Sequence, residues 1–198
     1  GIRDSSVTGV QTCALPIYSL NETIINNIYK FKNIAIIYKS NNQNTINNQK
    51  IINIKKFCIK NKILFFISDN IKLAIKYNSD GLFISSLNKK MYNIHSQKKN
   101  FYIIGSVHNV FEYYLKIRQG CKILMLSPIF YNKKYSFNKI LGVVRFNLIS
   151  NQLKSKICAL GGINLKNLNK IRMTKASSVA FLSLMNQPEI KKPIYRLW

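Results

Sequence analysis

Short apolar runs alternate with amphipathic stretches along the chain after residue 17. The runs are continuous, as in NIAIIYK (33–39), which is typical of strands buried on both faces of a parallel sheet. The stretches between them repeat apolar residues at helical spacing, as Ile51, Ile54 and Cys58 do within residues 45–61. This alternation predicts βαβ units and a parallel sheet.

Seven strands are predicted, and the pattern opens with a helix. The strands are expected at 33–39, 62–69, 81–85, 100–106, 122–130, 156–162 and 178–185. Helices are expected at 19–31 (N-cap Ser19 or Asn21), 45–61, 70–78, 109–120 (closed by Gly120) and 163–173. Because an eight-stranded barrel normally opens with a strand, the predicted class is an α/β TIM (β/α)8-type barrel whose first strand is missing or replaced by foreign sequence. An open doubly wound sheet is the alternative.

The first seventeen residues, GIRDSSVTGVQTCALPI, differ in composition from the rest of the chain. They lack the Lys, Asn and Ile bias that begins directly after them. The string resembles a translated sequencing-adapter fragment. We therefore expect residues 1–17 to be a non-native segment, standing where a first strand would lie, and residues 18–198 to form the barrel domain.

Polar and glycine residues follow one predicted strand after another. If the strands form a barrel, all of these residues converge on one rim, where the active sites of such barrels lie. They are Ser68 and Asp69, Ser85 and Ser86, Ser106, the loop after Phe130, Gly161 and Gly162, and Ser183.

The chain carries 31 Lys and Arg against 6 Asp and Glu, a formal net charge of +25. One interpretation is nucleic-acid binding, because basic surfaces release counterions from phosphate backbones. However, the lysines are spread over the whole length among many Asn and Ile residues, which AT-rich codons encode, and they form no basic arm. The pattern therefore favours codon bias over a nucleic-acid partner, while the positive field should attract anionic metabolites.

The four cysteines form no C-x-x-C pair, and neither His95 nor His108 lies at metal-ligand spacing from one. This argues against a zinc site and against a disulfide framework. No apolar run is long enough to cross a bilayer, and no signal-peptide pattern is present. The sequence therefore predicts a cytoplasmic protein without a membrane partner, and it leaves open whether the chain forms a homo-oligomer.

Six segments occur in a fixed order along the chain: FFISDN, DGLFIS, IIGSVHN, LSPIF, ALGGIN and SSVAFLSLM. They resemble, in turn, the Asn-Asp strand, D-G-V-H-L-G, I-G-x-S-x-H, G-P-V-F, A-I-G-G-I and D-G-V-A-V-V-S segments of thiamine-phosphate synthases. Their order and approximate spacing hold over residues 30–185. The superfamily also contains TenI-like thiazole tautomerases.

The resemblance implies an Mg²⁺-dependent reaction on phosphorylated small molecules. Synthases of this family join hydroxymethylpyrimidine pyrophosphate to thiazole phosphate and release thiamine phosphate and pyrophosphate. The difficult step is the departure of pyrophosphate from a benzylic-type carbon, which leaves a pyrimidine cation. Cations around the leaving group and carboxylates that hold the metal favour this step.

The resemblance also implies a role for particular residues. Asp69 and the position of Asn88 would hold the metal, while Ser106, His108 and Lys134 would be catalytic, with Ser106 near the pyrimidine. His108 resembles a histidine that tautomerases use as a proton shuttle. The implied substrate-binding residues are Lys39, Asn132, Lys133, Gly161, Gly162 and Ser183. Gly161, Gly162 and Ser183 would receive the thiazole phosphate through backbone N–H groups, the usual phosphate site of such barrels.

Three departures from the family pattern fall on the pyrophosphate and metal half of the implied site. Of the family's Gln-x-Arg-x-Lys, only a cation at Lys39 remains, and lysine lacks the bidentate fork of arginine. Asn88 stands where the family has a second metal-binding aspartate, which lowers the expected Mg²⁺ affinity. The Thr-x-Thr-Lys loop appears as residues 132–134, Asn-Lys-Lys, without the hydroxyls.

Structural explanations compete with these roles, and three functions stay open. Asp69 could cap the helix that follows it, His108 could bond locally at a helix entry, and Gly161 and Gly162 could form only a turn. The first function is a synthase, and the second is a TenI-like tautomerase or a non-catalytic phosphate-binding relative, motivated by the lost residues. The third is a basic nucleic-acid-binding protein.

Overall fold

The structure is a computed structural model that describes residues 13–31, 33–40, 47–92, 101–133, 135–181 and 184–186. Strands and helices alternate along the chain, as the apolar pattern predicts. The strands are β1 (Cys13–Ile17), β2 (Ile34–Tyr38), β3 (Leu64–Ser68), β4 (Gly81–Ile84), β5 (Tyr102–Val107), β6 (Ile123–Leu126), β7 (Lys156–Leu160) and β8 (Ser178–Ala180). The α-helices are α1 (Glu22–Ile28), α2 (Asn48–Lys60), α3 (Ile71–Lys76), α4 (Val110–Arg118) and α5 (Gly142–Gln152), and short 3₁₀ helices are η1 (Phe137–Lys139), η2 (Leu168–Met173) and η3 (Leu184–Asn186).

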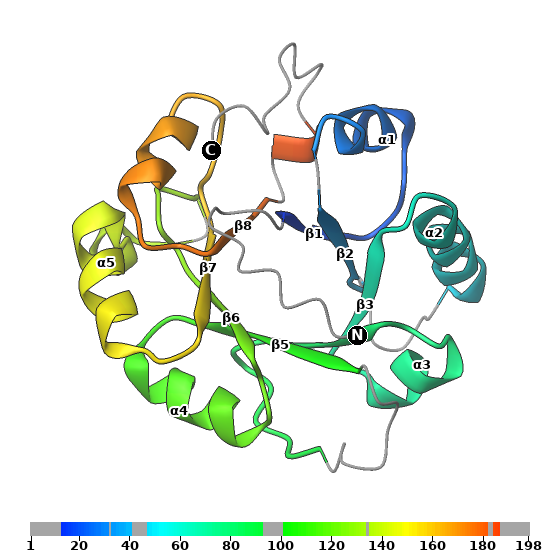
Figure 1. The fold of residues 1–198 in the computed structure, drawn as a ribbon, viewed down its shortest axis with the longest axis horizontal. Helices are drawn as coiled ribbons and strands as arrows, with labels where there is room; N and C mark the ends of the chain where they lie inside the picture. The colour runs from blue at the N-terminus through cyan, green and yellow to red at the C-terminus, as the bar shows by residue number, and fades with distance from the viewer. Residues whose placement is uncertain are drawn as a thin grey trace, which may run out of the picture.

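The eight strands are all parallel and close into a barrel in sequence order, with β8 pairing to β1. The helices lie outside the strands as an incomplete outer ring (Figure 1). This is the (β/α) barrel expected from the sequence, and the alternative of an open doubly wound sheet is wrong. Since all strands run in one direction, their carboxyl ends meet at one end of the barrel, called the C-terminal rim below.

Residues 13–17 fill the place of the first strand, so the count of seven strands is corrected to eight. Every residue of β1 pairs with β2, and Cys13 and Ala14 also pair with β8. Leu15 is fully buried and Ile17 nearly so. The CALPI segment forms a strand because it is short and apolar and pairs with β2 on one side and β8 on the other.

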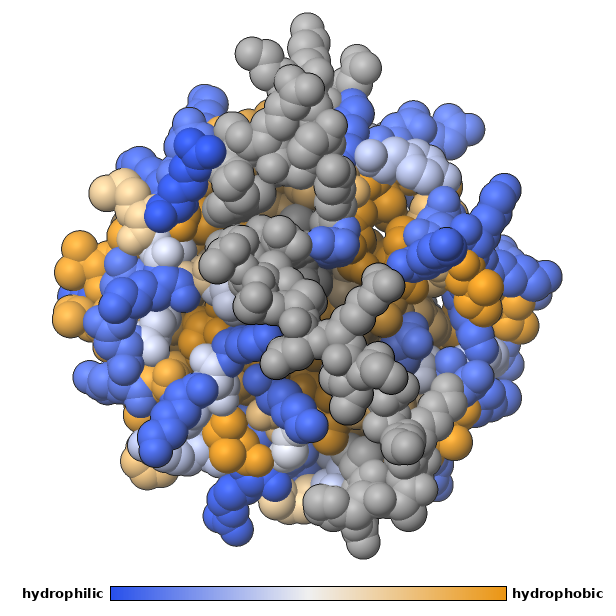
Figure 2. All heavy atoms as spheres, in the orientation of Figure 1, coloured by the Kyte–Doolittle hydropathy of each residue, from blue (hydrophilic) through white to orange (hydrophobic). Residues whose placement is uncertain are grey.

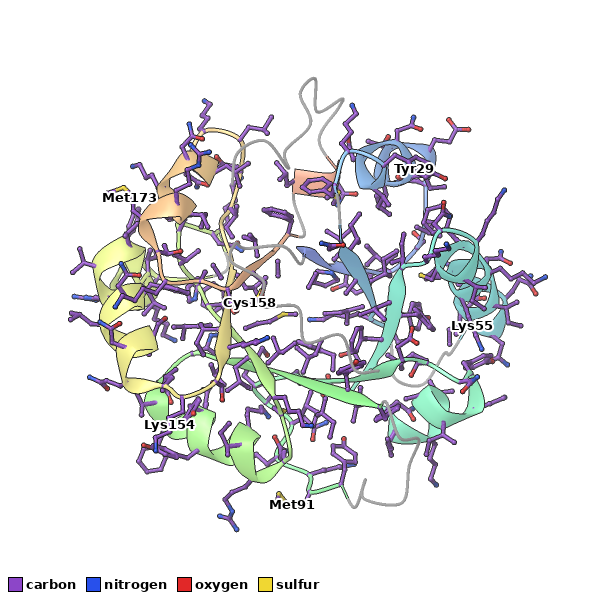
Figure 3. All side chains as sticks on the ribbon, viewed as in Figure 1. Tyr29, Lys55, Met91, Lys154, Cys158 and Met173 are labelled. Atoms are coloured by element: carbon purple, nitrogen blue, oxygen red, sulfur yellow. The ribbon has the colours of Figure 1, made fainter. Side chains whose placement is uncertain are left out.

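The core has two layers. One lies between the strands and the helices and holds the apolar faces of α1, α2 and η2. The other fills the inside of the barrel, where Phe66, Phe83, Met125 and Cys158 lie together with small residues such as Ala14. Figure 3 labels Cys158 inside the ring of strands. The inner layer makes the barrel a packed body and leaves the rim as the place for chemistry.

Besides β1, three elements differ from the sequence expectation. The α5 helix was not predicted, because it follows directly on the polar loop after β6 and carries only a weak apolar stripe with one fully buried side chain, Phe146. Of the segment expected as a helix at 163–173, only residues 168–173 are helical, and they form the 3₁₀ helix η2. The last strand is only three residues long and is followed by η3.

Hydrophilic side chains surround most of the face seen in Figure 2, with hydrophobic patches between them. No helix within the described ranges is both long enough and apolar enough to span a bilayer.

Candidate functional site

Asp69 directly follows β3 at the C-terminal rim and connects two strands. It adopts a left-handed backbone conformation (φ 56°). Its Oδ1 accepts hydrogen bonds from the backbone N–H of Ser85 (2.8 Å) and from the Asn88 amide (2.9 Å), while its Oδ2 accepts one from the Ser68 hydroxyl (2.9 Å). The carboxylate is therefore fixed in place at the ends of β3 and β4.

Asp69 is not the cap of the following helix, so that structural explanation is wrong. The N-cap of α3 is Asn70, whose Oδ1 accepts from the backbone N–H of Leu73 at 3.0 Å. Asn21 rather than Ser19 caps α1 in the same way. The Asp69 carboxylate therefore contacts the loop after β4 and lies beside an open cleft.

Asn88 belongs to the β4 loop (residues 85–92) and lies against Asp69. Its Nδ2 donates to Asp69 and to the Tyr92 hydroxyl (2.7 Å), and its Oδ1 accepts from the backbone N–H of Lys90 (3.0 Å). The amide oxygen, which is the atom a cation would bind, is thus turned toward the backbone. In this arrangement Asn88 acts as a hydrogen-bond donor to Asp69.

Ser86, Ser106 and His108 form a second linked group beside Asp69. The Ser106 hydroxyl accepts from the backbone N–H of Ser86 (2.9 Å), and the Ser86 hydroxyl lies 3.2 Å from His108 Nε2. These residues come from the ends of β4 and β5, two neighbouring strands. Ser85 and Ser86 are consecutive, so this group and the Asp69 group share one loop.

His108 is held in one orientation. Its Nδ1 lies 2.8 Å from the carbonyl oxygen of Ser127, which can only accept, so Nδ1 carries a proton. In the neutral ring Nε2 is then the acceptor for the Ser86 hydroxyl. The backbone N–H of His108 donates to the Glu112 carboxylate (2.8 Å). The backbone N–H of Glu112 in turn donates to Oδ1 of Asn109, the N-cap of α4 (2.9 Å), so the pair resembles a capping box shifted by one residue.

Lys39 follows β2 and reaches over the barrel interior. Its Nζ lies 4.9 Å from the centroid of the Phe83 ring, a cation–π contact. Phe83 belongs to the inner layer of the barrel. The ammonium of Lys39 is therefore at the mouth of the barrel and not on the outer surface.

Gly161 and Gly162 follow β7, and both have positive φ values (96° and 70°). A Cβ on Gly162 would lie 2.4 Å from the carbonyl oxygens of Phe130 and Tyr131, so the loops after β6 and β7 touch at this point. Neither glycine's backbone N–H donates to an acceptor in the described part of the chain. The turn thus requires glycine for its packing and leaves backbone donors that a phosphate could use.

The remaining predicted residues belong to the loop after β6 or lie outside the described residues. Asn132 is partly buried and Lys133 is exposed. Lys134, Ser183 and His95 lie outside the described residues, so their predicted roles stay predictions.

A cleft of about 690 Å³ opens beside Asp69. It is lined by the ends of β2 and β3, the start of α3 and the β4 loop. Three lysines and one aspartate contribute to its wall: Lys72, Lys89, Lys90 and Asp69. The cleft is positive on balance and suits an anionic group of pyrophosphate size.

The described residues fit Mg²⁺ only with help from a bound anion. No group of three or more His, Cys, Asp or Glu side chains lies together in the described ranges, and Asp69 is the one carboxylate of the cleft wall. Mg²⁺ is commonly held by one or two carboxylates together with substrate phosphates. Asp69 could hold the ion in that way, jointly with a pyrophosphate.

Sequence reasoning missed three residues that organise the site: Tyr92, Glu112 and Lys116. Glu112 had a signal, because an acidic residue three positions after Asn109, the first residue of the helix expected at 109–120, suggests a capping box. Lys116 also had one, since it lies three residues after the buried Tyr113 on α4. Tyr92 had none, because it belongs to an irregular loop.

Comparison with known proteins identifies the relatives of this chain. The profile of the family described as thiamine monophosphate synthase matches residues 22–185. The thiamine-phosphate synthase of Flavobacterium psychrophilum is 31% identical over 143 residues, covering 69% of this chain and 69% of that protein. The one from Lactococcus lactis subsp. cremoris (strain MG1363) is 26% identical over 174 residues, covering 86% of this chain and 78% of that protein.

A solved structure shows the same fold. It is that of a thiamine phosphate pyrophosphorylase from Pyrococcus furiosus, with a TM-score of 0.73 and 17% identity, covering 95% of this chain and 93% of that one. The family profile spans most of the chain, from α1 to η3. The chain therefore belongs to the thiamine monophosphate synthase family.

Proposed function

We propose that this chain is a thiamine-phosphate synthase, a transferase that joins hydroxymethylpyrimidine pyrophosphate to thiazole phosphate. The observation that carries the proposal is the grouping of Asp69, which follows β3, with Ser106 and His108 at the end of β5 on one rim. The family match and the curated relatives named thiamine-phosphate synthase support the same reaction.

The pyrophosphate of the first substrate would lie in the cleft beside Asp69. Lys89 and Lys90 line this cleft, and Lys39 stands at the barrel mouth, so cations surround the leaving group. The second substrate would place its phosphate at the backbone N–H groups of Gly161 and Gly162, together with Ser183. Lys133 and Lys134, with Asn132, would close the site from the loop after β6.

Mg²⁺ would be held by Asp69 and by the substrate's own pyrophosphate. When bound there, the ion neutralises negative charge on the departing group. Asn88 would orient Asp69 without binding the ion, since its amide N–H donates to the carboxylate and its side-chain oxygen accepts from the Lys90 backbone N–H. A single carboxylate predicts that the metal binds weakly until pyrophosphate is present.

The chemistry requires that the bond between the pyrimidine carbon and pyrophosphate breaks before or as the bond to the thiazole forms. The protein's part is to stabilise the charge that leaves and to hold the two substrates in line. Ser106, which is nearly buried beside Ser86, would orient the pyrimidine. Lys39 would stabilise the leaving pyrophosphate as a point charge.

The test uses the purified chain with both substrates and Mg²⁺, followed by detection of thiamine phosphate and pyrophosphate. We expect both products in equal amounts, and neither after addition of EDTA. If both ligands bind, as measured by calorimetry, and no thiamine phosphate forms, the proposal is wrong.

A thiazole tautomerase is the second candidate, and the Ser86–His108 contact favours it. His108, whose Nδ1 faces the Ser127 carbonyl oxygen and whose Nε2 faces a hydroxyl, is arranged to pass a proton between substrate atoms. Such an isomerisation needs no metal. It predicts activity in EDTA that is lost in His108→Ala, and full EDTA-resistant activity in that variant would exclude this mechanism.

A further inference from the structure

Lys116 is a lysine of α4 whose side chain has no exposed surface. Its Nζ donates to the carbonyl oxygen of Asn88 (2.7 Å) and to Oε1 of Gln119 (2.8 Å). Burial lowers the pKa of this ammonium group. Burying an ammonium is costly unless it is hydrogen-bonded, so this position is specified by its partners in the β4 loop.

Gln119, at the end of the same helix, is 2% exposed and holds the same loop. Its Nε2 donates to the carbonyl oxygens of Asn88 (2.9 Å) and Lys90 (2.7 Å). Lys116 and Gln119 together therefore make three hydrogen bonds to the backbone of residues 85–92. That loop contains no helix or strand, so its backbone carbonyls need partners from elsewhere. Figure 3 labels Met91 of this loop beside α4.

The two ends of Asn88 connect α4 to the candidate site. Its backbone carbonyl accepts from Lys116 and Gln119, and its side-chain amide donates to Asp69. A shift of the Asn88 backbone would therefore move the donor that fixes the Asp69 carboxylate. The same loop carries Ser85, whose N–H also donates to Asp69.

The barrel leaves room for this connection at Gly105 of β5. A Cβ on Gly105 would lie 3.1 Å from Cδ of Lys116 and 2.8 Å from Sγ of Cys121. The stem of Lys116 thus crosses the strand at the one residue without a side chain. Any larger residue at position 105 would displace Lys116 or Cys121.

We propose that Lys116 and Gln119 are positioning residues, which hold the β4 loop so that Asn88 keeps the Asp69 carboxylate aimed into the cleft. The proposal rests on the proposed synthase function, because it assigns Asp69 to the pyrophosphate and metal half of that site. Residues that orient metal-binding groups without touching the substrate typically contribute about 10- to 100-fold to metal affinity or activity.

The test compares Lys116→Met and the double variant Lys116→Met/Gln119→Met with wild type. Methionine keeps the length of both side chains, and replacing a buried charge by an apolar group of similar volume is often neutral or stabilising. In the single variant the Gln119 Oε1 atom loses the donor Lys116 Nζ, whereas the double variant removes the polar atoms of both side chains. Arg118→Met, an exposed cation on the same helix, is the matched control.

The first measurement is hydrogen exchange of the backbone amides of Ser85 and Ser86, which donate to Asp69 and Ser106. It needs no substrate. We expect faster exchange in both Lys116 variants and wild-type exchange in Arg118→Met. The second measurement is the KM for each substrate. We expect the KM for hydroxymethylpyrimidine pyrophosphate to rise about tenfold in the Lys116 variants, with the KM for thiazole phosphate unchanged.

The outcomes are distinguishable. Unchanged exchange in both variants overturns the proposal, and so does a rise in exchange that leaves both KM values unchanged or raises them equally. If wild type makes no thiamine phosphate, the proposed function fails, and calorimetric titration with Mg²⁺ and inorganic pyrophosphate replaces the KM comparison. Weaker pyrophosphate binding in the variants then supports the positioning role, and equal binding refutes it.

Discussion

The sharpest structural prediction concerns Leu15→Ala in β1. Leu15 is fully buried and lies opposite Ile36 of β2. The backbone N–H of Lys39 donates to Ile17 at the end of the same strand (2.9 Å). If residues 13–17 are the first strand, β1 both completes the core and holds the residue that places a cation at the barrel mouth.

The magnitude follows from the burial of Leu15. Leu→Ala removes about three carbon groups, and at about 0.8 kcal/mol for each buried group the transfer contribution is about 2.4 kcal/mol. The cavity left in a closed barrel adds to this, so we expect the free energy of unfolding to fall by about 3 to 5 kcal/mol. For a chain of this length the midpoint temperature should fall by roughly 10 °C.

The assay is urea unfolding followed by circular dichroism. Leu64→Ala is the control, because Leu64 also lies in a strand but is 41% exposed, and it should lose about 1 kcal/mol or less. Equal, small losses in the two variants would show that residues 13–17 do not pack in the barrel. A Leu15→Ala variant that fails to fold while Leu64→Ala folds is the same result in stronger form.

Three further predictions concern the site and the thiols. Asp69→Asn should lower kcat/KM about 100-fold, whereas Asp80→Asn, which changes a carboxylate before β4 at the opposite end of the barrel, should leave steady-state turnover nearly unchanged. Gly162→Ala should lower the thermal midpoint more than Gly142→Ala. Both glycines have positive φ, but only a Cβ at position 162 would meet backbone oxygens at 2.4 Å. Equal falls in the midpoint of the two variants would contradict this. Burial raises the pKa of the thiols of Cys58, Cys121 and Cys158 to about 12. These thiols should therefore resist a thiol reagent at pH 8 until the chain unfolds. Rapid labelling of the folded protein would refute this.

The apolar pattern predicted the elements that bury a continuous apolar run or a regular apolar stripe. The seven expected strands and helix α2 appear because continuous runs and the repeat at Ile51, Ile54 and Cys58 report burial directly. The α5 helix was missed, since only Phe146 of its eleven residues is fully buried. The first strand was set aside on composition, although five apolar residues with two open strand edges are enough to form a strand.

Site residues on strand ends could be located from sequence, but their partners could not. Parallel strands bring Asp69, Ser106 and His108 to one rim once the strands are assigned. The contacts of the β4 loop depend on side chains from a distant helix, such as Lys116, whose charge would suggest solvent. Lys116 lies three residues after the buried Tyr113, on the same face of α4, and a lysine on a buried face is informative because it requires a set of hydrogen-bond acceptors around it.

The substitutions that separate this chain from the family pattern fall together on the half of the site that the resemblance assigns to pyrophosphate and metal. If position 88 is the family's second metal-binding position, as the resemblance implies, Asn88 would weaken metal binding there, but it would also remove a negative charge that would repel pyrophosphate. Lys89 and Lys90 flank it in the same cleft, so the balance of charge there shifts from metal-binding carboxylates toward lysine ammonium groups. A leaving group stabilised mainly by lysines is screened by salt more than one clamped by a bound ion. Under the proposed function, the affinity for pyrophosphate should therefore fall as ionic strength rises, while a thiazole phosphate bound by the backbone N–H groups of Gly161 and Gly162 should lose much less affinity.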